Sequence, residues 1–164
     1  MQTQVPGFDL RPMSSQTNVK DLVPLLAVSS MERSLRFYTA GLGFALQRKW
    51  VVEGKIRWCW LALGGAALML QEFFREGQNA WVPKGQVGDG VSFNFQCVDA
   101  LALYHEFRSR ELDASEPEVG NSLWVTSLVD PDGYRLFFAS ATDVPEDTKL
   151  SEMNERTTFL LQGE

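Results

Sequence analysis

The chain offers few of the side chains that metal and nucleophilic chemistry usually need. It has one histidine, His105, which lies in the helix-like stretch 104–107, and two cysteines, Cys59 and Cys97, which both lie inside apolar runs. Zinc, iron and copper sites usually take two or more His or Cys ligands, and a catalytic triad usually needs a His beside its nucleophile. The sequence therefore favours an exposed helical His105 and buried, reduced thiols over either chemistry.

Aromatic side chains are the second candidate for function. There are five tryptophans, a high count for one small domain: Trp50, Trp58, Trp60, Trp81 and Trp124. Trp58 and Trp60 are two residues apart and share one face of an expected strand, whereas Trp81 lies in an expected loop. Indole rings can stack on a planar ligand and attract a cation. They can equally be core or dimer-interface residues, and the sequence leaves both interpretations open.

Charge and hydropathy exclude several classes of partner. The 164 residues include 15 basic and 21 acidic residues, a net charge of −6, and residues 141–164 hold six of the acids but only two of the bases. An acidic chain whose Lys and Arg are scattered lacks the clustered basic surface that binds nucleic acid. No apolar stretch approaches the roughly 20 residues of a membrane helix, and no signal-peptide pattern opens the chain. We therefore expect no nucleic-acid or membrane partner and a cytoplasmic location.

These residues must be positioned by elements that hydrophobic periodicity and turn residues predict. In the first half we expect a helix that begins at a capping box of Ser29 and Glu32, within the order strand 22–28, helix 31–40, and strands 44–53, 56–63 and 66–73. In the second half Asp99 is a good N-cap, within the order strand 91–97, helix 99–110, and strands 113–119, 123–129 and 134–139. The order βαβββ therefore occurs twice.

This duplication predicts an α+β fold. Placing Val28 on Cys97, an offset of 69 residues, aligns strand with strand and helix with helix. Two such modules, about 20–73 and 90–140, can form a curved mixed sheet around a shared cup that holds a ligand. Residues 1–19 are expected to be an N-terminal arm, and residues 141–164 an acidic extension with a short helix near 150–156 and an apolar end, Phe159 to Leu161, packed on a partner.

Two motifs in these modules resemble a known family. Residues 23–38 (VPLLAVSSMERSLRFY) with 41–44 (GLGF) resemble the opening of the glyoxalase, bleomycin-resistance and extradiol dioxygenase superfamily, also called vicinal oxygen chelate proteins. Residues 130–134 (DPDGY) resemble its closing hairpin, although Pro, Asp and Gly are also ordinary turn residues, and we assign the turn no chemistry. The motifs bracket residues 20–140.

The resemblance implies where a metal would be held. Metalloenzymes of this superfamily place ligands, usually His or Glu, on the first and last strand of each module. The matching positions here are Val23, Met69, Ser92 and Phe137, and none of their immediate neighbours can ligate. Hard and borderline cations need oxygen or imidazole donors. We therefore expect no metal and no cofactor.

The resemblance is nearest to the metal-free, bleomycin-resistance-like members, through residues 68–74 (LMLQEFF) and Val23-Pro24. By this resemblance the protein is a homodimer whose modules pair with those of its partner, and a planar cationic ligand lies in grooves lined by aromatic residues. Glu53, Glu72, Glu76 and Asp89 could hold a cation at the mouth or be solvated surface groups, whereas an inward Arg135 suits an anion.

Strand alternation assigns residues to the two sides of the sheet. The side opposite the cup is expected to form the core, through Leu26, Val28, Leu68, Leu70, Phe93, Phe95, Cys97, Leu136 and Phe138. The candidate ligand-binding residues are expected in and around the cup: Trp58, Trp60, Met69, Gln71, Phe73, Trp81, Ser92, Asn94, Trp124, Arg135 and Phe137.

Three functions are compatible with this pattern. The first is metal-independent binding of a small, partly aromatic molecule, as in the drug or metabolite sequestration of antibiotic resistance. The second is a glyoxalase- or dioxygenase-like enzyme, a lyase or oxidoreductase, that uses the same cup. The third is an interaction module whose aromatic residues are all interface, which predicts that no ligand-sized cavity exists. The identity and the charge of the ligand stay open.

Overall fold

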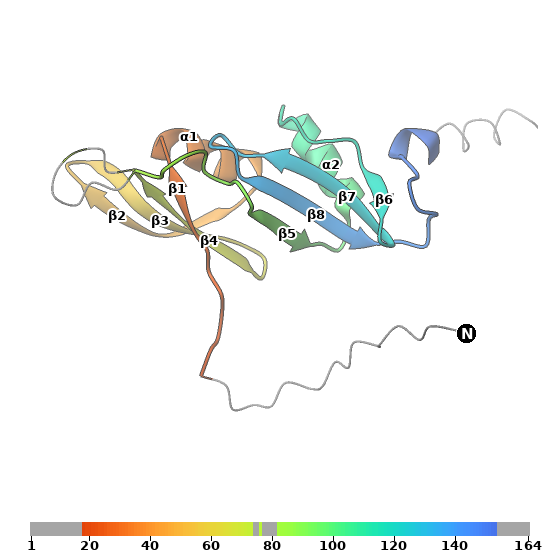
Figure 1. Ribbon diagram of the computed structural model, residues 1–164, viewed down its shortest axis with the longest axis horizontal. Coiled ribbons are helices and arrows are strands. Elements are labelled where there is room, and N and C mark those ends of the chain that lie inside the picture. The colour runs from red at the N-terminus through yellow and green to blue at the C-terminus, as the bar shows by residue number, and fades with distance from the viewer. Residues whose placement is uncertain (1–17, 74–75, 77–81, 154–164) are drawn as a thin grey trace, which may run out of the picture.

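Two four-stranded sheets, each with one helix, make up the protein (Figure 1). The computed structural model describes residues 18–73, 76 and 82–153. The first module comprises β1 (Leu25–Val28), α1 (Met31–Arg36), the π-helical turn η1 (Phe37–Gly41), β2 (Ala45–Val52), β3 (Lys55–Leu63) and β4 (Ala66–Glu72). The second comprises β5 (Ser92–Gln96), α2 (Ala100–Ser109), β6 (Glu118–Gly120), β7 (Leu123–Val129) and β8 (Arg135–Ala141).

The two sheets have the same topology. Their strand orders are β1-β4-β3-β2 and β5-β8-β7-β6. The first and last strands of each module are parallel, with Leu25 opposite Met69 and Ser92 opposite Arg135, and the other pairs are antiparallel. This confirms an α+β fold of two βαβββ modules with mixed sheets. It also makes β1 and β5 edge strands.

The helices begin where side-chain oxygens accept backbone N–H groups. Asp99 caps α2 as expected, accepting a hydrogen bond from the Ala102 amide at 2.9 Å. The expected capping box at Ser29 is wrong, because Ser30 is the N-cap of α1 and the Ser29 amide instead donates to Asp132 at 3.0 Å. The cap is therefore one residue later than expected, and the Ser29 amide takes part in a contact between the modules.

Two strands begin several residues later than the periodicity predicts. β1 begins at Leu25 instead of residue 22, directly after Pro24, which has no N–H to donate. β6 begins at Glu118 instead of residue 113. The Ser115 amide reaches the Ser127 carbonyl at 2.8 Å outside the regular ladder, and Pro117 again lacks a donor.

The hydrophobic core is shared by the two modules. Leu26, Val28, Leu68, Leu70, Leu136 and Phe138 are buried in one cluster, and Phe93, Phe95 and Cys97 pack against it, as the alternation predicts. The ring of Phe95 stacks on Phe138 at 4.7 Å and meets the edge of Phe44, from the first module, at 6.0 Å. Burial of this apolar surface is the main force that joins the modules.

A buried carboxylate also fixes how the two modules are oriented relative to each other. Asp130 accepts hydrogen bonds from the Tyr38 hydroxyl at 3.0 Å, the Asp132 amide at 2.9 Å and the Tyr134 amide at 2.8 Å. Burial raises its pKa, and these hydrogen bonds act in the opposite direction. The Tyr134 hydroxyl in turn donates to the Ala27 carbonyl at 3.2 Å and accepts from the Ala27 amide at 3.1 Å, across 107 residues.

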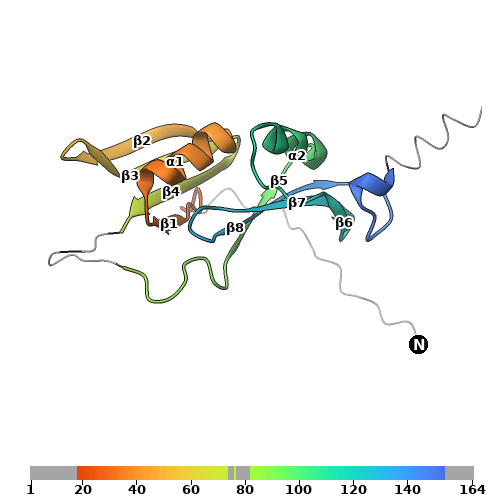
Figure 2. The same ribbon diagram turned by 90° about the horizontal axis from the view of Figure 1, so that it is seen from above.

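The rest of the turn that follows Asp130 holds the start of α1. Asp132 accepts from the Ser34 hydroxyl at 3.4 Å and lies 3.6 Å from Arg33, which also donates to the Pro131 carbonyl. The turn therefore has a structural role, fixing one module against the other. In Figure 2 the two helices lie on the same side of the molecule, with β1, β7 and β8 on the other side.

The residues after β8 cover the edge of the second sheet. The Val119 amide donates to the Thr148 carbonyl at 2.9 Å, and Glu146 accepts from the amides of Asn121 and Ser122. Residues 150–153 are helical, while 154–156 and the apolar end of the extension lie outside the described residues. In the described part of the chain, no helix is long and apolar enough to cross a membrane.

Replacing Tyr38 by Phe is expected to lower the free energy of unfolding by about 1–2 kcal/mol, because Asp130 loses one hydrogen bond in a buried site. Tyr104→Phe is the matched control, since no hydrogen bond of the Tyr104 hydroxyl occurs among the described residues, and its stability should be nearly unchanged. Urea unfolding followed by circular dichroism measures both. Equal stability of the two variants would contradict the role given to Asp130.

Candidate ligand-binding site

The first sheet has one face under α1 and one open face. On β3, Cys59 and Leu61 are fully buried, whereas Trp58 and Trp60 alternate with them and are half-buried. The cross-strand register places further side chains on the same open face, which we call the tryptophan face: Leu25, Arg48, Trp50, Trp58, Trp60, Met69 and Gln71.

The antiparallel register of the hairpin brings the indoles of the tryptophan face together. Trp50 is directly opposite Trp58, and Arg48 is directly opposite Trp60. Trp50 is 52% exposed, and the guanidinium carbon of Arg48 lies 5.9 Å from the centroid of the Trp60 ring. That distance is within the range of a cation–π contact. The face thus combines stacking surfaces with one positive charge.

The second sheet also has an open face, and it is more polar. Ser92 is opposite Arg135, and Asn94 is opposite Phe137, which is in turn opposite Ser127. The Asn94 amide group donates to the Ser92 hydroxyl at 3.3 Å. We call this set, together with Gln96, the polar face. It offers hydrogen-bond donors and acceptors beside a single aromatic ring.

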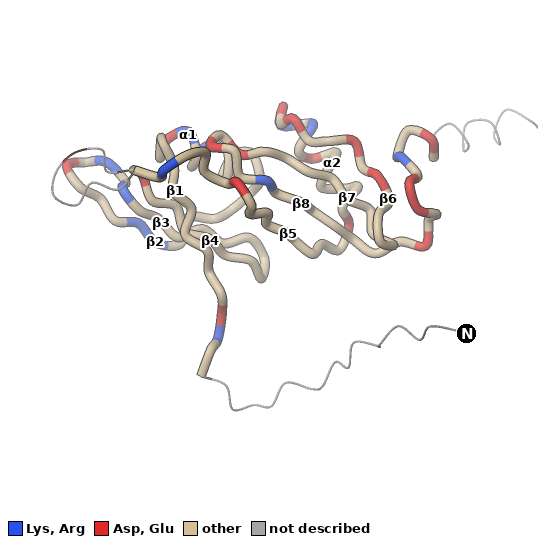
Figure 3. Tube along the Cα trace, viewed as in Figure 1, with Lys and Arg blue, Asp and Glu red and all other residues tan. Residues whose placement is uncertain are grey.

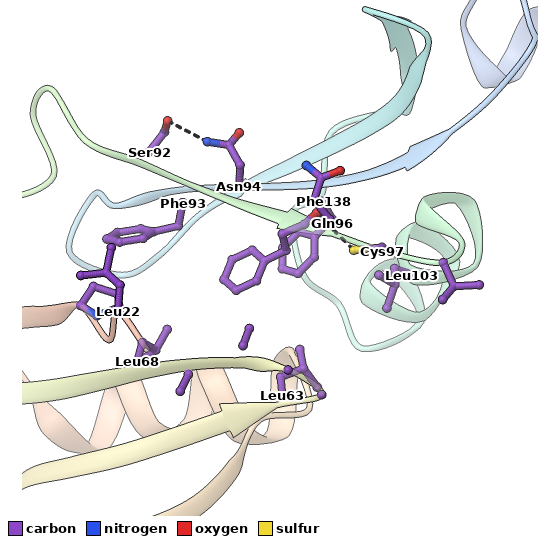
Figure 4. Close-up of a pocket in the computed structure, with 17 residues that line it drawn as sticks. Leu22, Leu63, Leu68, Ser92, Phe93, Asn94, Gln96, Cys97, Leu103 and Phe138 are labelled. Carbon is purple, nitrogen blue, oxygen red and sulfur yellow. Dashed lines mark hydrogen bonds between the residues drawn. The ribbon is translucent and has the colours of Figure 1, made fainter. Parts of the chain in front are cut away.

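A cavity of about 660 Å³ lies between the modules, in the size range of small-molecule sites. It is bounded by the β3–β4 hairpin, by β5 and by α2 (Figure 4). Phe93 points toward Leu22 and Leu68, whereas Ser92 and Asn94 point to the other side of β5. The cavity has a largely apolar floor, and it is distinct from the tryptophan face because none of the tryptophans lines it.

The expected ligand-binding residues therefore divide into groups. Trp58, Trp60, Met69 and Gln71 share the tryptophan face, while Arg135 and Phe137 belong to the polar face. Ser92 and Asn94, also on the polar face, border the cavity. The cavity between the modules thus includes two of the expected residues, and the others of this set lie on the open faces of the two sheets.

The remaining expected residues are Trp124, Phe73 and Trp81. Trp124 is 6% exposed and packs with Ala100 and Val119 under α2, on the covered side of its sheet. Phe73 follows β4 and its amide donates to the Val28 carbonyl at 3.0 Å. Trp81 lies outside the described residues. Trp124 is thus the expected ligand-binding residue that the structure places on a covered face.

Among the acids considered for the mouth of the cup, Glu72 already has partners. One of its carboxylate oxygens pairs with Arg57, and the other accepts from the Met31 amide at 2.9 Å, at the start of α1. Its role in the structure is therefore to hold the helix to the sheet. Glu53, Glu76 and Asp89 are exposed.

Arg48 is the site residue that the sequence reasoning missed. A signal for it was present, because Arg48 and Trp50 are two residues apart in one strand and therefore share a face. Its position beside Trp60 depends on the hairpin register, which has irregularities between Leu46 and Arg48 and between Trp50 and Val51. Single-strand alternation cannot supply that register.

Neither cysteine is poised as a nucleophile. Burial raises the pKa of Cys59 to about 11, and its sulfur lies 3.8 Å from that of Met31. Burial also raises the pKa of Cys97, which is half-buried. Because the thiolate is the reactive form, both side chains are unreactive thiols at neutral pH.

The residues at the metal positions of the superfamily do not fit a cation. Met69 and Phe137 lie on the open faces, Ser92 lies at the edge of the second sheet, and Val23 precedes β1. A thioether and one hydroxyl are too few and too weak as donors for a hard or borderline ion. In residues 18–73, 76 and 82–153, no group of three or more His, Cys, Asp or Glu could hold a metal.

Comparison with known proteins is consistent with this fold. Residues 22–138 match the family model described as the Glyoxalase/Bleomycin resistance protein/Dioxygenase superfamily. No curated protein matches the sequence. The solved structure of TnmS3, an antibiotic binding protein from Streptomyces sp. CB03234, is 19% identical, covers 77% of this chain and 100% of its own, and has a TM-score of 0.60.

Two further structures are similar. A glyoxalase/bleomycin resistance protein/dioxygenase from Nocardioides is 17% identical, with 83% of this chain and 93% of that chain covered and a TM-score of 0.59. TioX from Micromonospora sp. ML1 is 16% identical, with 74% and 99% covered and a TM-score of 0.55. At such identities the similarity shows the fold alone.

Stability measurements should separate core tryptophans from those of the open face. Trp124→Ala is expected to lower the free energy of unfolding by about 3–5 kcal/mol, because it leaves a cavity under α2. Trp50→Ala should lower it by only about 1 kcal/mol, because half of that side chain is already in water and mainly its pairing with Trp58 is lost. Urea unfolding measures both, and similar losses would contradict the assignment of Trp50 to an open face.

Proposed function

The chain belongs to the Glyoxalase/Bleomycin resistance protein/Dioxygenase superfamily, and we propose that it is a metal-independent binding protein that sequesters a small, partly aromatic organic molecule. In this proposal the tryptophan face supplies the stacking surface. The polar face supplies hydrogen bonds. The ligand is held without covalent or metal chemistry.

The observation that carries this proposal is the arrangement of side chains around Met69. Trp60 is directly opposite Met69, the residue that the family resemblance matches to a metal ligand. The next pair on the same face is Trp58 opposite Gln71. Large indole rings on an open sheet face are available to a planar ligand, and each stacking contact contributes on the order of 1 kcal/mol. At the position that the family resemblance matches to a metal ligand, this chain offers an apolar, polarisable surface.

One similar structure adds support of a weaker kind. TnmS3, which has the same fold, is described as an antibiotic binding protein. A shared fold at low identity raises the prior for a shared type of function but assigns none, because function depends on the site. The tryptophan face is the feature of this chain that makes binding of an aromatic molecule physically reasonable.

We also propose that the protein is a homodimer. Large apolar side chains are exposed around the edge strands β1 and β5: Leu22, Leu25, Val91 and Val98, with Leu22 94% exposed and Val98 fully exposed. Exposed apolar surface of this kind favours association, and an edge strand can pair with another chain. A second copy seated here would cover these residues.

Titration of tryptophan fluorescence tests the binding function. We expect saturable quenching by at least one member of a panel of planar aromatic drugs that includes bleomycin, with protein treated with a chelator and shown by elemental analysis to be metal-free. Trp60→Leu should weaken that binding about five-fold, the equivalent of roughly 1 kcal/mol. Tyr104→Leu, which removes an aromatic ring from α2, is the control and should bind as the native protein does.

Two results would argue against this function. Quenching that requires a divalent cation and disappears in chelator would favour the glyoxalase- or dioxygenase-like alternative. Unchanged affinity in Trp58→Leu, Trp60→Leu and Trp50→Leu alike would remove the tryptophan face from the site.

Sedimentation velocity tests the homodimer. Val98→Glu is expected to shift the protein from dimer to monomer, because a charge cannot be buried unpaired in an apolar interface. Val82→Glu, at a valine that is 46% exposed and is not among the residues of the proposed interface, should leave the dimer intact. A monomeric native protein, or a Val98→Glu variant that sediments as the native dimer does, would contradict the proposed interface.

A further inference from the structure

The arginines of this protein fall into two groups. Of the seven in the described residues, five form ion pairs with carboxylates: Arg33, Arg36, Arg57, Arg108 and Arg110. Among the described residues, Arg48 and Arg135 have neither an ion pair nor a hydrogen bond. These two are also the arginines on the open faces, one on each sheet.

The position of Arg48 is suited to binding an anion. Its guanidinium lies over the Trp60 ring, which orients the group while leaving its N–H edges available. No acidic residue belongs to the tryptophan face, and Glu72, at the end of β4, is already paired with Arg57. Figure 3 shows basic residues gathered along β2 and β3, whereas acidic residues predominate around the second module and the C-terminal segment.

The distance between side-chain pairs of the β2–β3 hairpin limits the size of the ligand that the tryptophan face can hold. Arg48 opposite Trp60 and Trp50 opposite Trp58 are successive pairs on the same face, and the ladder between them is regular. Residues two apart on a strand are separated by roughly 7 Å. An aromatic ring with a carboxylate spans about that length, so its ring can rest on Trp50 and Trp58 while its charged oxygens meet Arg48.

We propose that the tryptophan face takes a planar aromatic molecule that carries a carboxylate, with Arg48 as the anion-binding residue and Trp60 as the residue that positions it. This rests on the proposed binding function and adds the ligand class. A carboxylate accepts two parallel N–H bonds from a guanidinium. A cationic aromatic ligand, which the family resemblance implies, would instead be repelled by the unpaired charge of Arg48.

Three probes with one ring system and different charges test this inference: 2-naphthoate, 2-naphthamide and 2-naphthylmethylammonium. By isothermal titration calorimetry in low salt, 2-naphthoate should bind roughly three- to five-fold more tightly than the amide, the scale of an exposed ion pair. The ammonium probe should bind most weakly. The advantage of 2-naphthoate should shrink in 0.5 M salt, because counterions screen exposed charges.

Matched variants locate the charge. Arg48→Gln should abolish the preference for 2-naphthoate and leave the affinity for 2-naphthamide unchanged. Lys49→Gln removes the same charge from the next residue of β2, which is opposite Cys59 and therefore on the other face, and should keep the preference. Trp60→Leu should reduce the ratio of the two affinities, a readout that loss of stacking alone would not move.

The outcomes separate this inference from the binding function. Binding of all three probes without charge preference would overturn the anionic ligand class and leave an aromatic binding site. A preference that survives Arg48→Gln but is lost in Arg135→Gln would overturn the role of Arg48 and place the anion on the polar face. Failure of all three probes to bind at millimolar concentration would contradict both the inference and the binding function.

Discussion

The arrangement of the two modules depends on a carboxylate that is buried where they meet. Asp130 begins the closing turn of the second module, yet one of its partners is the Tyr38 hydroxyl of the first. A buried carboxylate is tolerated only when hydrogen bonds replace the water that it loses. Three donors do so here, and with Tyr134 on Ala27 they make one relative position of the modules strongly preferred. Apolar packing alone would select one orientation of the modules less strongly than these hydrogen bonds do.

This constraint decides which face of each sheet is free. Because the helix-covered faces contribute to one shared core, the other faces have no partner within the described chain. The same residue type then has opposite roles on the two sides. Trp124 packs under α2 and stabilises the fold, whereas Trp50, Trp58 and Trp60 lie on an open face where a ligand can reach them.

The side chains on the open faces decide what chemistry those faces can support. In this chain the positions that resemble the metal sites hold Met69, Ser92 and Phe137, which cannot provide a cation with the donors that it needs. Among the described residues, Arg48 is the charged residue of the tryptophan face, although the chain as a whole is acidic, whereas the open face of the second sheet carries both Arg135 and Glu118. The aromatic surface therefore comes from the tryptophans, and the sign of the charge beside them comes from Arg48.

Much of the fold could be predicted from the sequence, because strand alternation, caps and turn residues act over a few positions. β7 has the expected bounds, Asp99 caps α2, and the alternating core residues of β4, β5 and β8 lie on the helix side. Trp58 and Trp60 share a face, as predicted, and so do Met69 and Gln71, since period-two alternation is a local property; the register of β3 with β4 brings the two pairs onto one face.

Other features were decided only by tertiary structure, because they depend on residues distant in the chain. The Ser29 amide donates to Asp132, 103 residues away, a contact that no local pattern could indicate. Whether a tryptophan is core or surface depends on where α2 packs, and Arg48 meets Trp60 only through the hairpin register. The sequence by itself determined the elements and their faces. The meeting of the two modules, through long-range hydrogen bonds and shared burial, decided which faces stay open.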